Sequence, residues 1–151
     1  MGPDKAVSVL IVEDQALLAM ELDYVLRESG YAVVGCAMDA AEAIKLATET
    51  RPDVALVDVN LRDGRSGPDV ARRLIEDCDA TVVFLTANPE QIPDGFSGAI
   101  GVVIKPFDAQ TLRDVVEFAG RFGRERVLAD RPSKLRLAPW LAKAAFDQPR
   151  P

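Results

Sequence analysis

Short apolar runs alternate with amphipathic segments along the first 120 residues of the chain. The apolar runs are rich in β-branched residues, which favours strands that are buried on both faces. The intervening segments carry apolar side chains at three- and four-residue spacing, which predicts helices with one buried face. Strands are predicted at residues 7–12, 31–37, 54–57, 81–85 and 101–104.

Capping and turn residues mark where the predicted helices begin and end. Gly30 ends the first helical pattern, and Asp39 with Glu42 forms a capping box for the second. Pro68 suits the first turn of the third helix, because its missing N–H has no partner there in any case. Asp108 is the predicted N-cap of the last helix before residue 120.

Five strand–helix units in alternation predict an α/β fold. We expect a doubly wound, flavodoxin-like, five-stranded parallel sheet in the order 2-1-3-4-5, with helices on both faces. Residues 6–123 should form this domain, and residues 124–151 a short basic C-terminal extension. We expect no separate output domain, because 151 residues fit one domain with a short extension.

Composition and charge exclude several classes of function. The absence of histidine excludes His-ligated zinc, Ser-His-Asp catalysis and a role as phosphohistidine donor. No apolar run approaches the ~20 residues needed to cross a bilayer, and the first residues do not resemble a signal peptide, so we expect a cytoplasmic protein that binds no membrane. The net charge of −6 combines an acidic body with an excess of Lys and Arg from Arg121 onward. An acidic body binds nucleic acids poorly.

Polar side chains follow four of the five predicted strands. Glu13 and Asp14 follow the first strand, Asp58 the third, Thr86 the fourth and Lys105 the fifth. The expected strand order brings these ends together, so three carboxylates should repel one another unless a divalent cation neutralises them. Magnesium suits such an all-oxygen set. Asp58 is then placed to accept a phosphoryl group, with Lys105 and Thr86 holding its oxygens.

This combination resembles the signature set of response-regulator receiver domains of two-component systems, over about residues 8–122. The residues that carry the resemblance are Glu13-Asp14, Asp58, Thr86 and Lys105-Pro106-Phe107. The resemblance implies that Asp58 is the phosphoacceptor and that Asp14 and Asp58 bind Mg²⁺ directly. It implies that Glu13 binds the metal through water and that the main-chain carbonyl of Asn60 completes the ligands. It also implies a cis peptide bond before Pro106.

The resemblance further implies a single-domain response regulator that acts as a signalling switch. It would receive phosphate from a sensor histidine kinase or a histidine phosphotransfer protein. Its output would be altered binding of a downstream protein, or drainage of phosphate as a sink. It would have no enzymatic activity beyond its own autophosphorylation and autodephosphorylation. The oligomeric state stays open, a homodimer included.

Two alternatives remain at the level of sequence. A phosphatase of the haloacid-dehalogenase type also combines an aspartyl nucleophile, Mg²⁺, a threonine and a lysine. That class places its nucleophile after the first strand in Asp-x-Asp form, whereas here Asp58-Val59-Asn60 follows the third strand. A phosphorylation-independent interaction module is the second alternative, and it would require a broken site.

Three features depart from the family pattern. Val102 stands three positions before the lysine, where many receivers carry an aromatic residue. Residues 88–98 contain two prolines and two glycines, so the fourth helix should be short or irregular. The extension contains Pro139-Trp140-Leu141, a possible amphipathic segment. It is either a latch over the acidic body, a docking peptide anchored by Trp140, or a frayed end.

Overall fold

A six-stranded sheet forms the centre of the molecule, with the strands in the order β2-β1-β3-β4-β5-β6. The structure is a computed structural model, and it describes residues 6–147. The first five strands are parallel, and β6 pairs antiparallel with β5. The strands are β1 (Ser8–Val12), β2 (Ala32–Ala37), β3 (Val54–Val57), β4 (Thr81–Thr86), β5 (Gly101–Ile104) and β6 (Arg136–Leu137).

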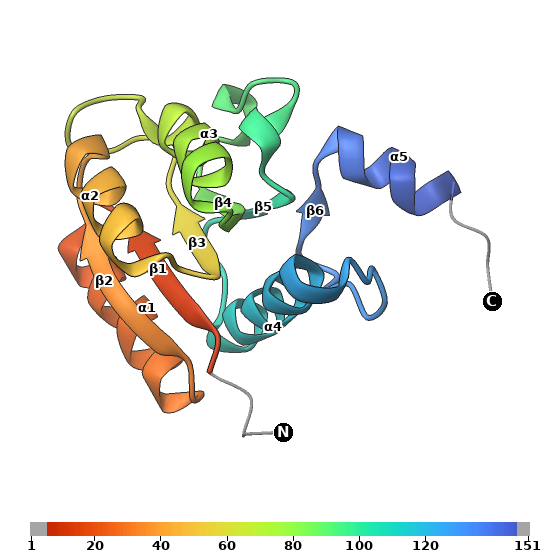
Figure 1. The fold of residues 1–151 in the computed structure, drawn as a ribbon, viewed down its shortest axis with the longest axis horizontal. Coiled ribbons are helices and arrows are strands. Elements are labelled where there is room, and N and C mark those ends of the chain that lie inside the picture. The colour runs from red at the N-terminus through yellow and green to blue at the C-terminus, as the bar shows by residue number, and fades with distance from the viewer. Residues whose placement is uncertain (1–5, 148–151) are drawn as a thin grey trace.

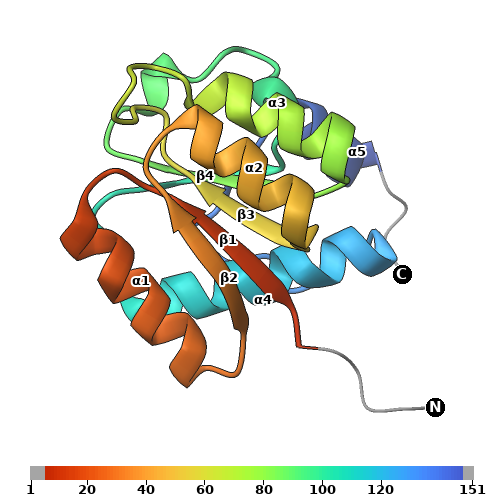
Figure 2. The ribbon, with the colours of Figure 1, turned by 60° about the vertical axis from the view of Figure 1, so that its left-hand side comes forward.

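Helices cover both faces of the sheet (Figures 1 and 2). The α-helices are α1 (Ala16–Glu28), α2 (Ala40–Thr50), α3 (Gly67–Cys78), α4 (Ala109–Glu125) and α5 (Pro139–Asp147). Helices α1 and α4 pack on one face, and α2 and α3 on the other. No helix within residues 6–147 is both long enough and apolar enough to span a bilayer.

The five parallel strands have the predicted order and the predicted helices on both faces, so the flavodoxin-like fold is confirmed. All residues of β3 and β4 are buried, because helices cover these strands on both sides. The predicted caps are present as well. The Asp39 carboxylate accepts the Glu42 N–H at 2.9 Å, and the Asp108 carboxylate accepts the Thr111 N–H at 2.8 Å.

The prediction of five strands was one strand short. Strand β6 adds to the free edge of β5 through the pairs Gly101↔Leu137 and Val102↔Arg136. A two-residue strand is too short to show the alternation that marks strands in a sequence. The approach is close: a Cβ atom on Gly101 would lie 2.5 Å from the main-chain oxygen of Arg136, so glycine is the residue that allows this pairing.

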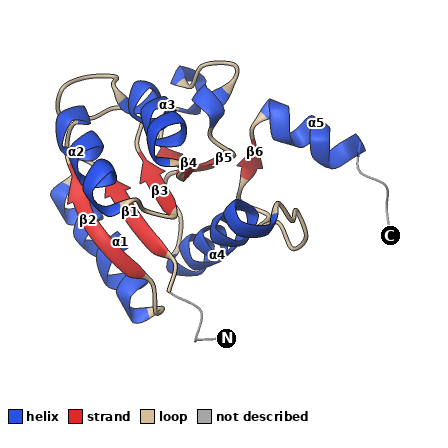
Figure 3. Cartoon of the chain, viewed as in Figure 1, coloured by secondary structure: helices blue, strands red, loops and turns tan. Residues whose placement is uncertain are grey.

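The C-terminal extension packs against the domain over its described part. The Trp140 indole N–H donates to the main-chain oxygen of Ala99 at 3.0 Å. Leu135, Leu137 and Leu141 are buried in the same apolar cluster as α1 and α4. This packing agrees with the latch interpretation. Figure 3 shows β6 at the edge of the sheet, followed by α5.

Residues 88–98 form no full helix, as predicted. Two short 3₁₀ turns, η1 (Pro89–Gln91) and η2 (Phe96–Gly98), replace it on the face covered by α2 and α3. Proline restricts the backbone at the start of η1, and Ser97 has a positive φ of 51° inside η2, which interrupts any helical run.

Candidate functional site

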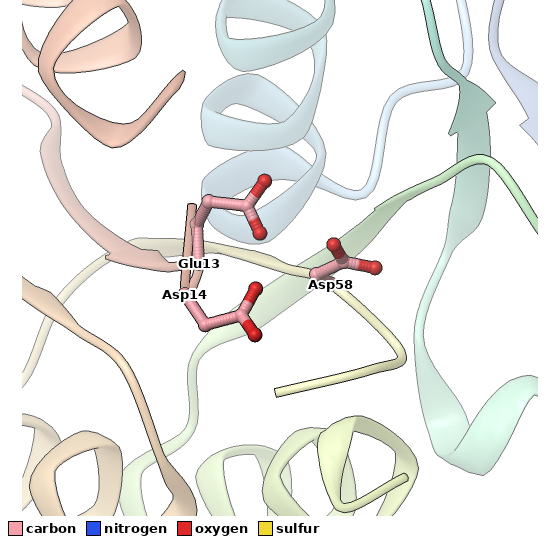
Figure 4. Close-up of side chains that lie close together, drawn as sticks. All are labelled: Glu13, Asp14 and Asp58. Carbon is pink, nitrogen blue, oxygen red and sulfur yellow. The ribbon is translucent and has the colours of Figure 1, made fainter. Parts of the chain in front are cut away.

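Three carboxylates meet at the carboxyl ends of the neighbouring strands β1 and β3 (Figure 4). Glu13 and Asp14 follow β1, and Asp58 follows β3. The two strands are paired in register up to Val12↔Val57, so the residues after them lie side by side. Oxygen atoms of the three carboxylates all lie within 4.8 Å of one another. The sequence prediction that these side chains converge is therefore correct.

Lys105 joins this cluster from the end of β5. Its Nζ atom donates to Glu13 Oε1 at 2.6 Å and to Asp58 Oδ2 at 2.7 Å. The Lys105–Pro106 peptide bond is cis, as the resemblance implied. The amine is mostly buried, with 14% of the side chain exposed, so solvent screens these two ion pairs less than it would screen surface pairs.

Burial and mutual repulsion make the ionised form of Glu13 unfavourable. Its side chain is buried, and its Oε2 atom has no hydrogen-bond partner among the described residues. Burial raises the pKa of Glu13 to about 7, against the hydrogen bond from Lys105 and with a further contribution from Asp58. Burial acts to lower the pKa of Lys105, but its hydrogen bonds to Asp58 and Glu13 raise that pKa overall.

The donor set of this cluster fits a divalent metal ion. Three carboxylates face a single ammonium group, so negative charge remains in excess. The unpartnered oxygen of Glu13 offers a further acceptor that no described residue satisfies. Hard cations such as Mg²⁺ prefer carboxylate oxygens and retain some of their water. The carboxylate cluster at the ends of β1 and β3 therefore suits Mg²⁺.

Thr86 lies at the end of β4, the strand next to β3, and Asn60 lies two residues after Asp58. Thr86 is fully buried at the end of β4, and its hydroxyl oxygen accepts the Asn88 N–H at 3.0 Å. The Asn60 N–H points to Asp58 Oδ1 at 3.4 Å, which is a long hydrogen bond. The Asn60 side-chain amide donates to Gln91 Oε1 at 2.7 Å and so ties η1 to the loop after β3. Sequence reasoning missed Gln91, because no motif or spacing marks it.

A second feature missed from the sequence is an exposed apolar row on α1. Leu17, Met20 and Tyr24 are 72%, 67% and 67% exposed. Together with Phe107 they line a groove of about 450 Å³ between α1 and the start of α4. The signal was present, because these apolar residues lie outside the stripe of α1 that packs on the sheet.

The family follows from a comparison with known proteins. Residues 9–117 match the model of the response regulator receiver domain, which covers more than half of the chain. The chain therefore belongs to the response-regulator receiver domains of two-component signalling. The acidic cluster occupies the place where the fold and the sequence both predicted the site.

Two curated regulators and one solved structure show the extent of the similarity. The phyllosphere-induced regulator PhyR of Methylorubrum extorquens is 36% identical over 121 residues, which span 79% of this chain and 45% of PhyR. The transcriptional regulatory protein PdtaR of Mycobacterium tuberculosis is 39% identical over 116 residues, which span 74% of this chain and 55% of PdtaR. The chain thus spans about half the length of these relatives.

The solved structure is the signal receiver domain of a modulated diguanylate cyclase from Desulfovibrio desulfuricans. It superimposes with a TM-score of 0.73 at 32% sequence identity, over 82% of this chain and all of that domain. The similarity therefore extends from the sequence to the arrangement of the elements.

Proposed function

We propose that this chain is a phosphorylation-controlled switch and that Asp58 is its phosphoacceptor. The observation that carries this proposal is the position of the Asp58 carboxylate, which lies beside Glu13 and Asp14 and is held by Lys105 at 2.7 Å. Residues 6–123 are the proposed receiver domain, with residues 124–151 as an extension. The family match supports this proposal over the phosphatase alternative.

The proposed reaction is a phosphoryl transfer. One Asp58 oxygen forms a bond to phosphorus while the bond from phosphorus to the donor's leaving group breaks, and the bonding electrons stay with the leaving group. Lys105 then pairs with one phosphoryl oxygen, in place of its present contact with Asp58. The Thr86 hydroxyl donates a hydrogen bond to another phosphoryl oxygen.

Magnesium is the proposed cofactor. Glu13, Asp14, Asp58 and the Asn60 main-chain carbonyl are its proposed ligands, with Glu13 acting through water. The bound ion would offset the charge that the phosphoryl group brings to three carboxylates. The unpartnered oxygen of Glu13 supports this assignment, because it is a buried acceptor that no described residue satisfies.

This chain contains no histidine, so it cannot supply a phosphohistidine itself. The proposed phosphodonor is therefore another protein, a sensor histidine kinase or a histidine phosphotransfer protein. The exposed apolar groove between α1 and the start of α4 is the proposed docking surface for that donor. It begins at Leu17, a few residues after Asp14, so a protein bound there would reach the site. The output is altered binding of a downstream protein, or drainage of phosphate.

Intact-mass spectrometry tests the phosphoacceptor. The wild type is incubated with Mg²⁺ and acetyl phosphate, with and without EDTA, and compared with Asp58→Asn. We expect a metal-dependent gain of about 80 Da, one phosphoryl group on one nucleophile, which disappears in Asp58→Asn. Asp94→Asn is the matched control, because Asp94 is exposed in the loop between η1 and η2. It should label like the wild type.

Two results would reject this proposal. The first is no adduct under conditions where another receiver domain is labelled, which would favour a phosphorylation-independent interaction module. The second is an adduct that persists in Asp58→Asn. Multiple-turnover hydrolysis of phosphate esters would instead support a phosphatase.

A further inference from the structure

A second groove, which Phe107 also lines, lies between β5 and the segment that leads into β6. Its volume is about 520 Å³. Strand β5 and the start of α4 form one side, and residues 133–136 form the other. Its lining includes Val103, Ile104, Phe107, Lys134 and Arg136.

The edge of β5 is only half covered in this groove. Strand β4 pairs with all four residues of β5, from Gly101 to Ile104. Strand β6 pairs on the other side with Gly101 and Val102 alone. Val103 and Ile104 therefore have no strand partner on that side within residues 6–147. Ile104 is also 43% exposed, so its apolar side chain is open to a ligand.

The opposite wall of the groove is basic. Lys134 and Arg136 are both exposed. The Arg136 side chain has no hydrogen-bond or ion-pair partner among the described residues. Asp108 also lines the groove, and its carboxylate caps α4: the hydrogen bond from the Thr111 N–H lowers the pKa of Asp108 most, and the charge of Lys134 lowers it by a smaller amount. Arg136 is thus available to an incoming anion.

We propose that this groove binds an extended acidic peptide segment of a partner protein. The segment adds to the sheet beside Val103 and Ile104 and continues the edge that β6 leaves uncovered. Its carboxylates face Lys134 and Arg136. Unpaired strand edges are templates for such additions, in which main-chain hydrogen bonds give affinity and side-chain pockets give specificity. A small anion would use neither the strand edge nor the apolar floor formed by Ile104 and Phe107.

The basic wall belongs to this chain's own extension. Lys134 and Arg136 lie outside residues 9–117, where the family match is found. The groove also shares no residue with the carboxylate cluster of Glu13, Asp14 and Asp58. Peptide binding here can therefore be tested on the unphosphorylated chain.

Fluorescence anisotropy with a defined probe tests the proposal. The probe is a fluorescein-labelled peptide of alternating valine and acidic residues, Val-Glu-Val-Asp-Val-Glu, titrated with the full chain. We expect saturable binding that weakens roughly tenfold or more in Lys134→Glu/Arg136→Glu, because the reversed charges repel the carboxylates. The control is Lys45→Glu/Lys143→Glu, which changes the net charge equally at two exposed lysines outside the groove. It should change the affinity less than about twofold.

Changes to the peptide test the strand pairing without altering the protein. N-methylation of alternate peptide nitrogens removes the N–H groups that would face β5, and we expect roughly tenfold weaker binding for one of the two alternate patterns. Replacing the acidic residues by lysine should abolish binding. The proposal is overturned if no saturable binding occurs, if the lysine peptide binds equally well, or if both N-methylated peptides bind like the parent.

Discussion

Burial and charge conflict at Glu13. It is 3% exposed, and two further carboxylates lie within 4.8 Å of it, with Lys105 as the nearby cation. An ionised carboxylate in such a place lacks the hydration it would have in the unfolded chain. The site is therefore strained by its own charge until a cation or a proton relieves it.

When metal is removed, the free energy of unfolding should depend on pH because of the buried Glu13 carboxylate. The native state holds the Glu13 proton up to about pH 7, whereas the unfolded chain releases it near pH 4.5. The unfolded state binds fewer protons between these values, so the free energy of unfolding falls as the pH rises. This difference in pKa corresponds to at most about 3–4 kcal/mol. Urea unfolding in EDTA between pH 5 and pH 8 measures the fall.

Glu13→Gln isolates this contribution, because glutamine does not titrate. We expect the variant to show a much smaller loss of stability over the same range. The lowered pKa values of Asp39 and Asp108 act on the acidic side of pH 4 and do not enter this window. A wild type whose stability stays level or rises from pH 5 to pH 8 would contradict the prediction.

At the scale of elements, the pairing of β5 with β6 depends on one glycine. A Cβ atom at Gly101 would meet the Arg136 main-chain oxygen at 2.5 Å and the Leu135 side chain at 3.0 Å. We expect Gly101→Ala to lower the free energy of unfolding by about 1–3 kcal/mol, as overpacking does. Amide exchange should also speed up at Ala138, whose N–H donates to the main-chain oxygen of Ile100, the residue before β5, at 2.8 Å.

Gly95→Ala is the matched control for this element. A Cβ atom there has nothing within 4 Å, and the φ of −84° suits alanine. The control should leave both stability and the exchange of Ala138 unchanged. Equal effects of the two substitutions would show that β6 is not held by close approach at Gly101.

The exposed apolar row on α1 should affect phosphotransfer from a protein donor but not from a small phosphodonor. Leu17→Ser/Met20→Ser removes apolar area from the proposed docking groove without touching the carboxylates. The rate of labelling by acetyl phosphate should stay within about twofold of the wild type. The rate of transfer from a histidine kinase that labels the wild type should fall roughly tenfold, because a few apolar anchor residues dominate the affinity of such interfaces. Equal slowing with both donors would place the defect in the site itself.

At the scale of the whole molecule, the extension and the domain share one core. Leu135, Leu137 and Leu141 are buried in the cluster that also holds α1 and α4. Trp140 is the only tryptophan of the chain and is bonded to Ala99, so its fluorescence reports this contact. We expect urea transitions followed by Trp140 fluorescence and by far-UV circular dichroism to coincide, as in two-state unfolding. An earlier fluorescence transition would mean that the extension unfolds separately.

Much of the fold and the carboxylate cluster could be predicted from local pattern. The apolar runs of β1 and β3 mark strands buried on both faces, and the parallel order that follows places Glu13, Asp14 and Asp58 at neighbouring strand ends. The spacing of the apolar residues and the positions of the polar residues that follow them carry this information. The carboxyl ends of the strands in such a sheet always meet at one edge.

The sequence by itself thus determined the five parallel strands, the irregular segment 88–98 and the residues that gather at the site. Tertiary structure alone decided the antiparallel addition of β6, the bridge of Lys105 between Glu13 and Asp58, and the contact of Gln91 with Asn60. The physical reason is the separation along the chain of the residues that are in contact. Periodicity reports which face of an element is buried, whereas these contacts join residues far apart in the chain and depend on how the packed elements present single atoms to one another.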